Sequence, residues 1–341
     1  MNNKIYPWQV ELWKRLANNR ERLPHALLLR GRSGTGKFDF ALQFTQSLLC
    51  QTPTKHGFAC GICASCGWFT QGNHPDYRLL TPEQGSETPD NDERLAESAK
   101  STKKSKIISV GQIRELDSFL ELTSHHSAGL RIVLIHPAET FNSASANALL
   151  KMLEEPPSGV IFILVSHQPQ RLLPTIMSRC QKIDMPVPTT EIALEWLQQQ
   201  GLKDAKLLLH YAGGSPLSAL KEAEEGGRQL PGIWQMLSLG GKLDPFATAT
   251  LCLTQGMEAA LNALQKWIYD LLNYRLTGEM RYHTEQAGAL QALTKSVDLG
   301  LLLDFQGKLD EARKSANHPL NQELQLESLL LQYTQLFSMR T

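Results

Sequence analysis

A glycine-rich segment at residues 31–38 constrains the fold of this chain more than any other feature. It reads GRSGTGKF and matches the phosphate-binding pattern G-x-x-x-x-G-K. The apolar run 25–30 before it predicts a buried strand, and 37–49 after it predicts a helix. The backbone amides of the loop would then lie at a helix N-terminus, where anions bind. The candidate nucleotide-binding residues are Gly31, Gly34, Gly36 and Lys37.

The same segment lacks the residues that would hold Mg²⁺. A working phosphate loop ends in Ser or Thr, whose hydroxyl binds the metal, but this one ends in Phe38. The strand expected at 131–135 is followed by His136 and Pro137, where an ATPase needs a carboxylate pair. We expect His136 to be a tolerated loop residue. The pattern therefore indicates a structural or regulatory relative of an ATPase.

Two interpretations of Lys37 stay open at this stage. Its ammonium group can bind a phosphate passively, or it can pair with a carboxylate of the chain itself. Binding of ATP or ADP is therefore not decided by the sequence.

Four of the six cysteines lie close together and predict a metal site. Their spacing is C-x₉-C-x₂-C-x₂-C, and short C-x₂-C spacing lets neighbouring thiolates wrap one Zn²⁺ ion. An iron–sulfur cluster also uses four thiolates and is the alternative. Four cysteine ligands leave no open position on zinc, so a structural site is expected. The ligands would be Cys50, Cys60, Cys63 and Cys66, whereas the isolated Cys180 and Cys252 are expected in the core.

Charge and hydropathy exclude several classes of protein. Lys plus Arg and Asp plus Glu number 34 each, so there is no overall positive field to hold nucleic acid non-specifically. The N-terminal residues lack the apolar core of a signal peptide, and the longest apolar runs are too short to cross a bilayer. We expect a cytoplasmic protein with no membrane partner, in which thiols stay reduced.

Strands and helices are expected to alternate in the first half of the chain, which favours a parallel sheet covered by helices. Between them, 81–106 is polar, lacks apolar periodicity and is expected to be a mobile surface loop with no assigned function. The expected strands are 25–30, 77–80, 131–135, 160–165 and 180–184, and the expected helices are 8–19, 37–49, 109–122 and 143–154.

The second half of the chain is expected to be helical throughout. Short helices are predicted at 191–200, 205–212 and 217–225, the last after a Gly-Gly-Ser-Pro turn. From about residue 229, leucine and aromatic residues recur at helical spacing, which is typical of helix-packing faces.

Several further motifs, in this order and spacing, resemble those of one family. The chain resembles the delta-prime subunits of bacterial DNA polymerase III clamp loaders, which are degenerate AAA+ proteins. The resemblance runs nearly end to end. It is carried by Tyr6-Pro-Trp, Leu23-Pro-His-Ala-Leu-Leu, the four cysteines, His74-Pro-Asp-Tyr, Val110-Gly-Gln-Ile-Arg-Glu-Leu, Ala146-Asn-Ala-Leu-Leu-Lys-Met-Leu-Glu-Glu-Pro-Pro, Ser178-Arg-Cys, His318-Pro-Leu-Asn-Gln-Glu-Leu and Glu327-Ser-Leu-Leu-Leu.

The resemblance implies three domains. These are an α/β AAA+ module over 1–184 with a zinc-binding insert at about 50–75, a small helical lid over 185–227, and an all-α collar over 228–341 that assembles a ring. It also implies partners: the motor (gamma/tau) and delta subunits, the sliding clamp through the complex, and primer–template DNA within the ring.

The resemblance assigns a role to single residues as well. In the Ser-Arg-Cys motif, Arg179 corresponds to an arginine finger that reaches a neighbour's ATP, and Ser166 falls at the polar sensor position. Motor subunits have an arginine shortly after Gly-Ser in the lid, but Gly214-Ser215 is followed by Pro-Leu-Ser here. The chain is therefore expected to be a stator without intrinsic ATPase activity.

Two alternatives are kept. The first is an active AAA+ motor of the same complex. Four residues argue against it together: Phe38, His136, Pro137 and Leu217. The second is a stand-alone zinc-containing protein that binds nucleic acid. The neutral overall charge disfavours it, although a local basic stretch at 14–32 would suit it.

Overall fold

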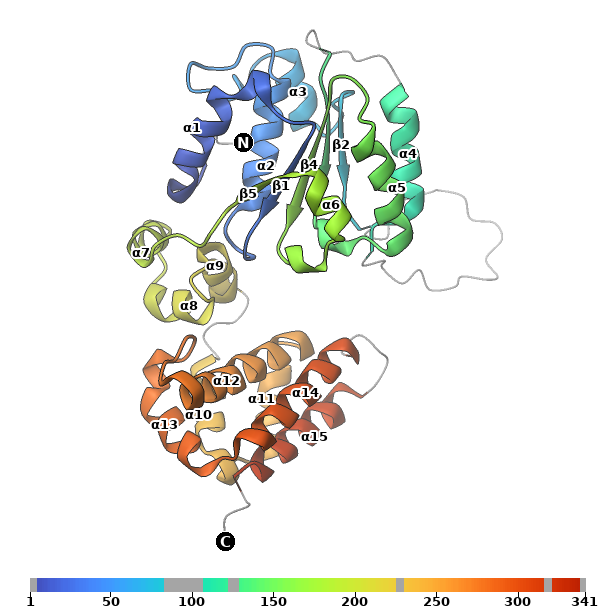
Figure 1. The fold of residues 1–341 in the computed structure, drawn as a ribbon. Helices are drawn as coiled ribbons and strands as arrows, with labels where there is room; N and C mark the ends of the chain where they lie inside the picture. The colour runs from blue at the N-terminus through green and yellow to red at the C-terminus, as the bar shows by residue number, and fades with distance from the viewer. Residues whose placement is uncertain (1–4, 83–106, 122–128, 225–229, 316–320, 338–341) are drawn as a thin grey trace, which may run out of the picture. The chain divides into compact units, whose positions relative to one another are not determined.

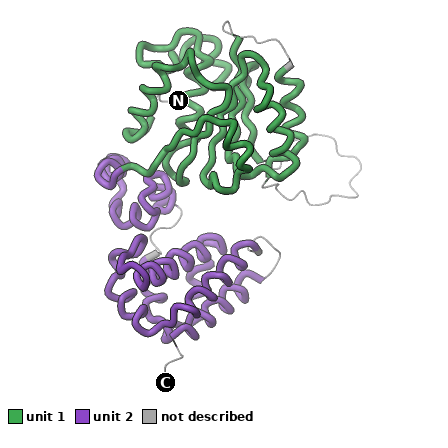
Figure 2. Tube along the Cα trace, in the orientation of Figure 1, with its two compact units in different colours: residues 1–188 green, residues 189–341 purple. Residues whose placement is uncertain are grey.

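The computed structural model describes residues 5–82, 107–121, 129–224, 230–315 and 321–337. The chain divides into two compact units, residues 1–188 and residues 189–341 (Figure 2). Most of the segment predicted as a mobile loop, 83–106, lies outside the described residues.

The first unit is built on a five-stranded parallel sheet with the order β2-β3-β4-β1-β5 (Figure 1). β4 is the central strand, and β1 lies between β4 and β5, so Leu28 is opposite Leu164 on one side and Lys182 on the other. The strands are β1 (Ala26–Arg30), β2 (Tyr77–Leu80), β3 (Arg131–Ile135), β4 (Val160–Ser166) and β5 (Gln181–Asp184).

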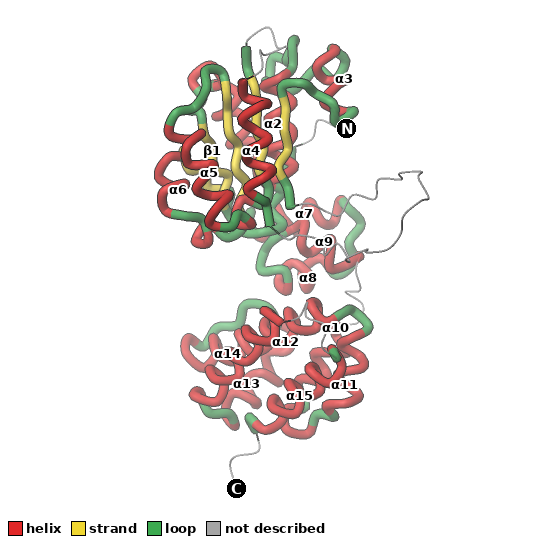
Figure 3. The backbone as a smooth tube through the Cα atoms, turned by 90° about the vertical axis from the view of Figure 1, so that its right-hand side faces the viewer, coloured by secondary structure: helices red, strands yellow, loops and turns green. Residues whose placement is uncertain are grey.

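Both faces of this sheet are buried, which explains why its central strands are continuous apolar runs. Side chains alternate along a strand, so Ile132 and Leu134 face one hydrophobic cluster while Val133 and Ile135 face the other. Helices α1 and α2 cover the first face, and α4 to α6 cover the second (Figures 1 and 3). The helices of this unit are α1 (Val10–Asn18), α2 (Lys37–Leu49), α3 (Ala64–Thr70), α4 (Val110–Glu121), α5 (Ser143–Glu154) and α6 (Pro174–Arg179).

The predicted α/β module is confirmed, and each expected strand is present to within one residue at either end. The helix expected at 8–19 differs at its start, because residues Pro7–Gln9 form a 3₁₀ turn and the α-helix begins at Val10. Proline suits the first position of that turn, because the fixed φ angle of proline is close to the helical value. The α-helix Ala64–Thr70 was not predicted, because seven residues are too few to show helical periodicity.

The second unit is helical, and its helices share one hydrophobic core. Among the described residues, no helix is long and apolar enough to span a membrane. The helices are α7 (Thr190–Gln199), α8 (Ala205–Tyr211), α9 (Pro216–Glu224), α10 (Leu230–Ser238), α11 (Pro245–Leu253), α12 (Met257–Thr277), α13 (Ala287–Ser296), α14 (Leu299–Ser315) and α15 (Gln322–Gln335).

A buried carboxylate on α12 binds a neighbouring loop of this unit. Asp270 on α12 accepts hydrogen bonds from the backbone N–H of Arg281 (2.9 Å), Tyr282 (3.0 Å) and His283 (2.7 Å), and from the His283 ring (2.9 Å). Burial alone would raise the pKa of Asp270, but these hydrogen bonds outweigh it and the pKa is lowered. The loop 281–283 is therefore fixed to α12 by a single side chain.

Asp270→Asn is expected to reduce the free energy of unfolding by roughly 3 kcal/mol, because an amide cannot accept from all these donors. The pKa of Asp270 is lower in the folded chain, so its stabilisation is present above about pH 4 and is lost as the pH falls through the folded pKa. Urea unfolding at several pH values should give a higher free energy of unfolding for the wild type than for Asp270→Asn, and this difference should narrow below about pH 4. The exposed Asp304→Asn on α14 is the control, and an equal effect from it would contradict the prediction.

Candidate functional site

The phosphate-loop remnant joins β1 to α2, as predicted. Gly36 is the residue before the helix and has a φ of +78°, a conformation that favours glycine. A Cβ atom on Gly36 would lie 2.3 Å from the ring of Tyr6, so only glycine fits there. The three predicted glycines therefore lie in the loop between β1 and α2, and Lys37 is the first residue of α2.

Lys37 is buried rather than on the surface, with 1% of its area exposed. Its ammonium group donates a hydrogen bond to the carbonyl oxygen of Arg32, within the same loop. Burial lowers the pKa of Lys37 to about 8, and the nearby carboxylate of Glu139 opposes that shift. The lysine thus bonds its own loop while a carboxylate lies close enough to act on its charge.

The N-terminal segment covers the outside of the loop. Gln9 donates to the carbonyl oxygens of Thr35 and Gly36, both at 2.9 Å, and Trp8 donates to that of Thr35 at 3.0 Å. Tyr6 donates to the carboxylate of Asp39 at 2.9 Å. These contacts join the N-terminal segment to the loop and to the first turn of α2.

The positions where Mg²⁺ ligands are expected hold stacked rings instead. Phe38 stacks on His136 with ring centroids 4.2 Å apart and an interplanar angle of 20°. The Nε2 atom of His136 lies 3.1 Å from the Nε2 atom of His167, so one imidazole donates to the other. Burial lowers the pKa of both histidines, that of His167 to about 4. Both imidazole rings are therefore neutral at pH 7. Neither Phe38 nor His136 offers an oxygen atom that could bind Mg²⁺.

His136 is more than the tolerated loop residue that was expected. It directly follows β3, and His167 directly follows the neighbouring strand β4, so their side chains meet at the C-terminal ends of these strands. Glu139 lies beside this pair, and its carboxylate accepts a hydrogen bond from the backbone N–H of His167 at 3.1 Å. The pairing was missed because two histidines 31 positions apart give no local signal.

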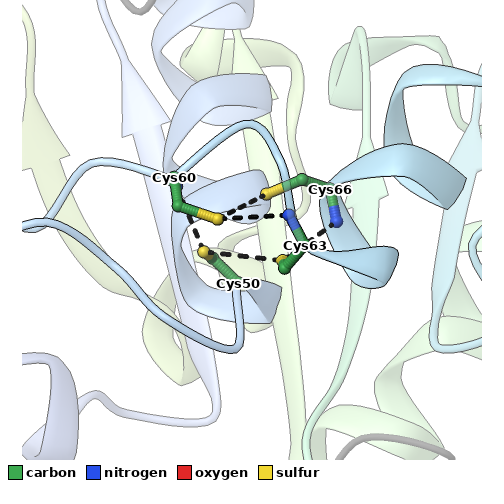
Figure 4. Close-up of side chains that lie close together, drawn as sticks. All are labelled: Cys50, Cys60, Cys63 and Cys66. Carbon is green, nitrogen blue, oxygen red and sulfur yellow. Dashed lines mark hydrogen bonds between the residues drawn. The ribbon is translucent and has the colours of Figure 1, made fainter.

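The four predicted cysteines come together in one cluster (Figure 4). All four sulfur atoms lie within 4.8 Å of one another, with Cys50 to Cys63 at 3.9 Å and Cys60 to Cys66 at 4.0 Å. A tetrahedral Zn²⁺ with bonds of about 2.3 Å requires sulfur–sulfur distances of about 3.8 Å, so the geometry fits zinc.

Backbone amides support the same cluster. The N–H groups of Cys60, Cys63 and Cys66 each donate to a sulfur of the cluster, at 3.2 to 3.4 Å. Such bonds favour the thiolate form that a metal needs. Hydrogen bonds, first that with Thr52, lower the pKa of Cys60 to about 6, whereas burial raises the pKa of Cys50 and of Cys66. The remaining cysteines, Cys180 and Cys252, are free and buried in the core, as predicted.

Arg179 is the last residue of α6, and its guanidinium group is held by two partners. Nη1 donates to the carbonyl oxygen of Thr175 at 2.9 Å, and Nη2 donates to the carboxylate of Glu154. About a third of the side chain (32%) is exposed, so the group can be reached from outside the chain. Ser166 is buried at the end of β4, where its hydroxyl accepts from the N–H of Gln168.

A parallel sheet with β1 between β4 and β5, and a phosphate-loop remnant after β1, together define a degenerate AAA+ module. Family models described as DNA polymerase III, delta subunit, match residues 8–189 and, for its C-terminal part, residues 234–335. A relative named DNA polymerase III subunit delta' is also 34% identical over 97% of this chain, so the chain belongs to the family of DNA polymerase III delta-prime subunits.

Two relatives named subunit delta' agree with this assignment. The DNA polymerase III subunit delta' of Pseudomonas aeruginosa is 34% identical, over 97% of this chain and 98% of its own length. That of Escherichia coli is 34% identical over 63% of this chain and 60% of its own length. A solved structure of a DNA polymerase III gamma subunit-related protein from Thermotoga maritima is 20% identical, covers 96% of this chain and 99% of its own, and has a TM-score of 0.46.

Proposed function

We propose that this chain is a non-hydrolysing stator of a bacterial clamp loader and helps to load the sliding clamp onto primed DNA during replication. Membership of the delta-prime family supports the replication role. The observation that carries the non-hydrolysing part is the stack of Phe38 on His136. Neutral rings stand where a motor subunit needs a hydroxyl and a carboxylate to hold Mg²⁺.

Without that metal, the charge on a transferred phosphoryl group has no clamp. The lid sequence adds a third missing part, because Ser215 is followed by Pro216 and Leu217 rather than by an arginine. The lysine of the loop cannot compensate, since it bonds the carbonyl of Arg32 and is buried. Hydrolysis therefore belongs to the neighbouring motor subunits in this proposal.

The isolated chain is expected to release phosphate from ATP no faster than buffer, with or without clamp and primed DNA. Phe38→Thr restores the hydroxyl but not the acidic pair, so it is expected to remain inactive. Steady-state phosphate release checks both proteins. Turnover by the wild type that disappears in Lys37→Ala would contradict the proposal and favour a motor subunit.

The positive role is assigned to Arg179. We assign it as an arginine finger that stabilises charge at the γ-phosphate bound by a neighbouring motor (gamma/tau) subunit. Its exposure at the end of α6 suits a contact in trans. The complex also contains a delta subunit and encloses primer–template DNA in the cytoplasm. Residues 185–227 serve as the lid and 228–341 as the collar that holds the ring together.

The cysteine cluster is assigned to one structural Zn²⁺. Its four thiols fit a tetrahedral ion, and no position is left for a water or substrate. Zinc would hold the segment between Cys50 and Cys66 together. That segment also contacts α1, since Phe58 stacks on Trp13 at 4.5 Å and Trp13 donates to the carbonyl oxygen of His56 at 3.0 Å.

A further inference from the structure

Two helices of the first unit end at the same place on its surface. Glu154 is the last residue of α5 and Arg179 is the last residue of α6, and their side chains form an ion pair. Each lies next to a buried residue, Leu153 before the glutamate and Cys180 after the arginine. The backbone positions of both members are therefore fixed by the core beneath them.

The position of Glu154 is unfavourable for the helix that carries it. A helix C-terminus has partial negative charge, which attracts cations and repels carboxylates. Lys151 and Arg179 obey that rule at the ends of α5 and α6, but Glu154 does not. The ion pair with Arg179 offsets this repulsion, so the glutamate is explained by its partner rather than by its helix.

Arg179 can also leave Glu154 for another anion at little cost in free energy. Its side chains are 32% and 49% exposed, and exposed ion pairs contribute little to stability. A γ-phosphate inside a neighbour's closed site offers more charge in a drier environment, where a guanidinium binds it as a planar fork. A nucleoside diphosphate lacks that group. The two anions would therefore compete for the same terminal nitrogen of Arg179.

We propose that Glu154 is a positioning residue which holds Arg179 while the neighbouring subunit carries a nucleoside diphosphate and releases it to a nucleoside triphosphate. This rests on the function proposed above for Arg179. Arg179 then contacts the neighbour's nucleotide only when a γ-phosphate is present, because only a γ-phosphate outcompetes the carboxylate of Glu154. It acts through Arg179 and has no contact with the nucleotide itself.

The test measures the affinity of the full-length chain for the complex of its partner subunits, once with a non-hydrolysable ATP analogue and once with ADP. Glu154→Gln keeps the shape of the side chain and removes the charge. It is expected to raise affinity roughly two- to fivefold with the ATP analogue, the range expected for an exposed pair, and to leave affinity with ADP unchanged. Glu154→Asp, which is too short to keep the same contact, is expected to act in the same direction.

The control makes the Glu154→Gln substitution in a chain that lacks the Arg179 guanidinium. In an Arg179→Ala background, Glu154→Gln is expected to have no effect, whereas a purely structural effect would persist. The exposed neighbour Glu155→Gln is the matched control and should be silent in both backgrounds. If Arg179→Ala weakens binding with the ATP analogue but Glu154→Gln changes nothing, or weakens it too, this inference alone fails. If Arg179→Ala has no effect on either state, the proposed function fails with it.

Discussion

Arg179→Ala is expected to lower clamp- and DNA-stimulated ATP hydrolysis of the assembled loader only in part, while clamp loading falls much further. An arginine finger is worth about 10³–10⁵ in rate at its own site in other phosphoryl-transfer systems. Only one of several motor sites faces this chain in the proposed ring, so the other sites keep hydrolysing. Loading suffers more if the sites must act together. Reconstituted loaders would give both rates.

Folding and assembly should be unaffected by that change, because Arg179 is partly exposed at the end of α6 and the collar makes the ring contacts in this proposal. Arg179→Lys is expected to fail nearly as badly, since a point charge lacks the planar fork of a guanidinium. Arg171→Ala, which removes another exposed arginine of the same unit, is the matched control. Wild-type loading by a normally assembled Arg179→Ala complex would return Arg179 to an ordinary structural role.

Cys63→Ser is expected to release one zinc ion per chain and to unfold the segment between Cys50 and Cys66, while most helical signal survives. Structural zinc contributes on the order of 10 kcal/mol to the folding of small modules. The parallel sheet has its own core on both faces, so the damage should stay local. The fluorescence of Trp13 should change as well, because Phe58 stacks on its ring.

Elemental analysis and circular dichroism would check both parts of this prediction. Cys252→Ala removes a thiol from the second unit and should keep the metal. An iron–sulfur absorption band in the wild type, or a wild-type chain without metal, would refute the assignment to zinc.

The elements that could be predicted from sequence are those whose pattern of residues lies within one short segment. β3 is a continuous apolar run buried on both faces, and its predicted bounds coincide with Arg131–Ile135. The phosphate loop and the four cysteines follow spacing rules set by backbone geometry and by metal coordination. Each of these signals lies within about twenty residues, so no knowledge of the fold was needed.

What could not be predicted depends on contacts between distant segments. His136 and His167 meet because β3 and β4 are neighbours in the sheet, and Glu154 reaches Arg179 because α5 and α6 end together. The cover of the loop by Gln9 likewise joins residues 26 positions apart. In the second unit, the repeated leucines indicated helices but not where each helix begins and ends, because the apolar pattern continues across a short turn.

The most direct test of the central claim uses a loader in which only the motor subunit next to this chain can hydrolyse ATP. The account predicts that hydrolysis by this complex falls about 10³-fold or more with Arg179→Ala, and is unchanged by Lys37→Ala in a chain that still assembles. Hydrolysis that is insensitive to Arg179 but requires Lys37 would contradict it, because the chain would then be a motor rather than a stator.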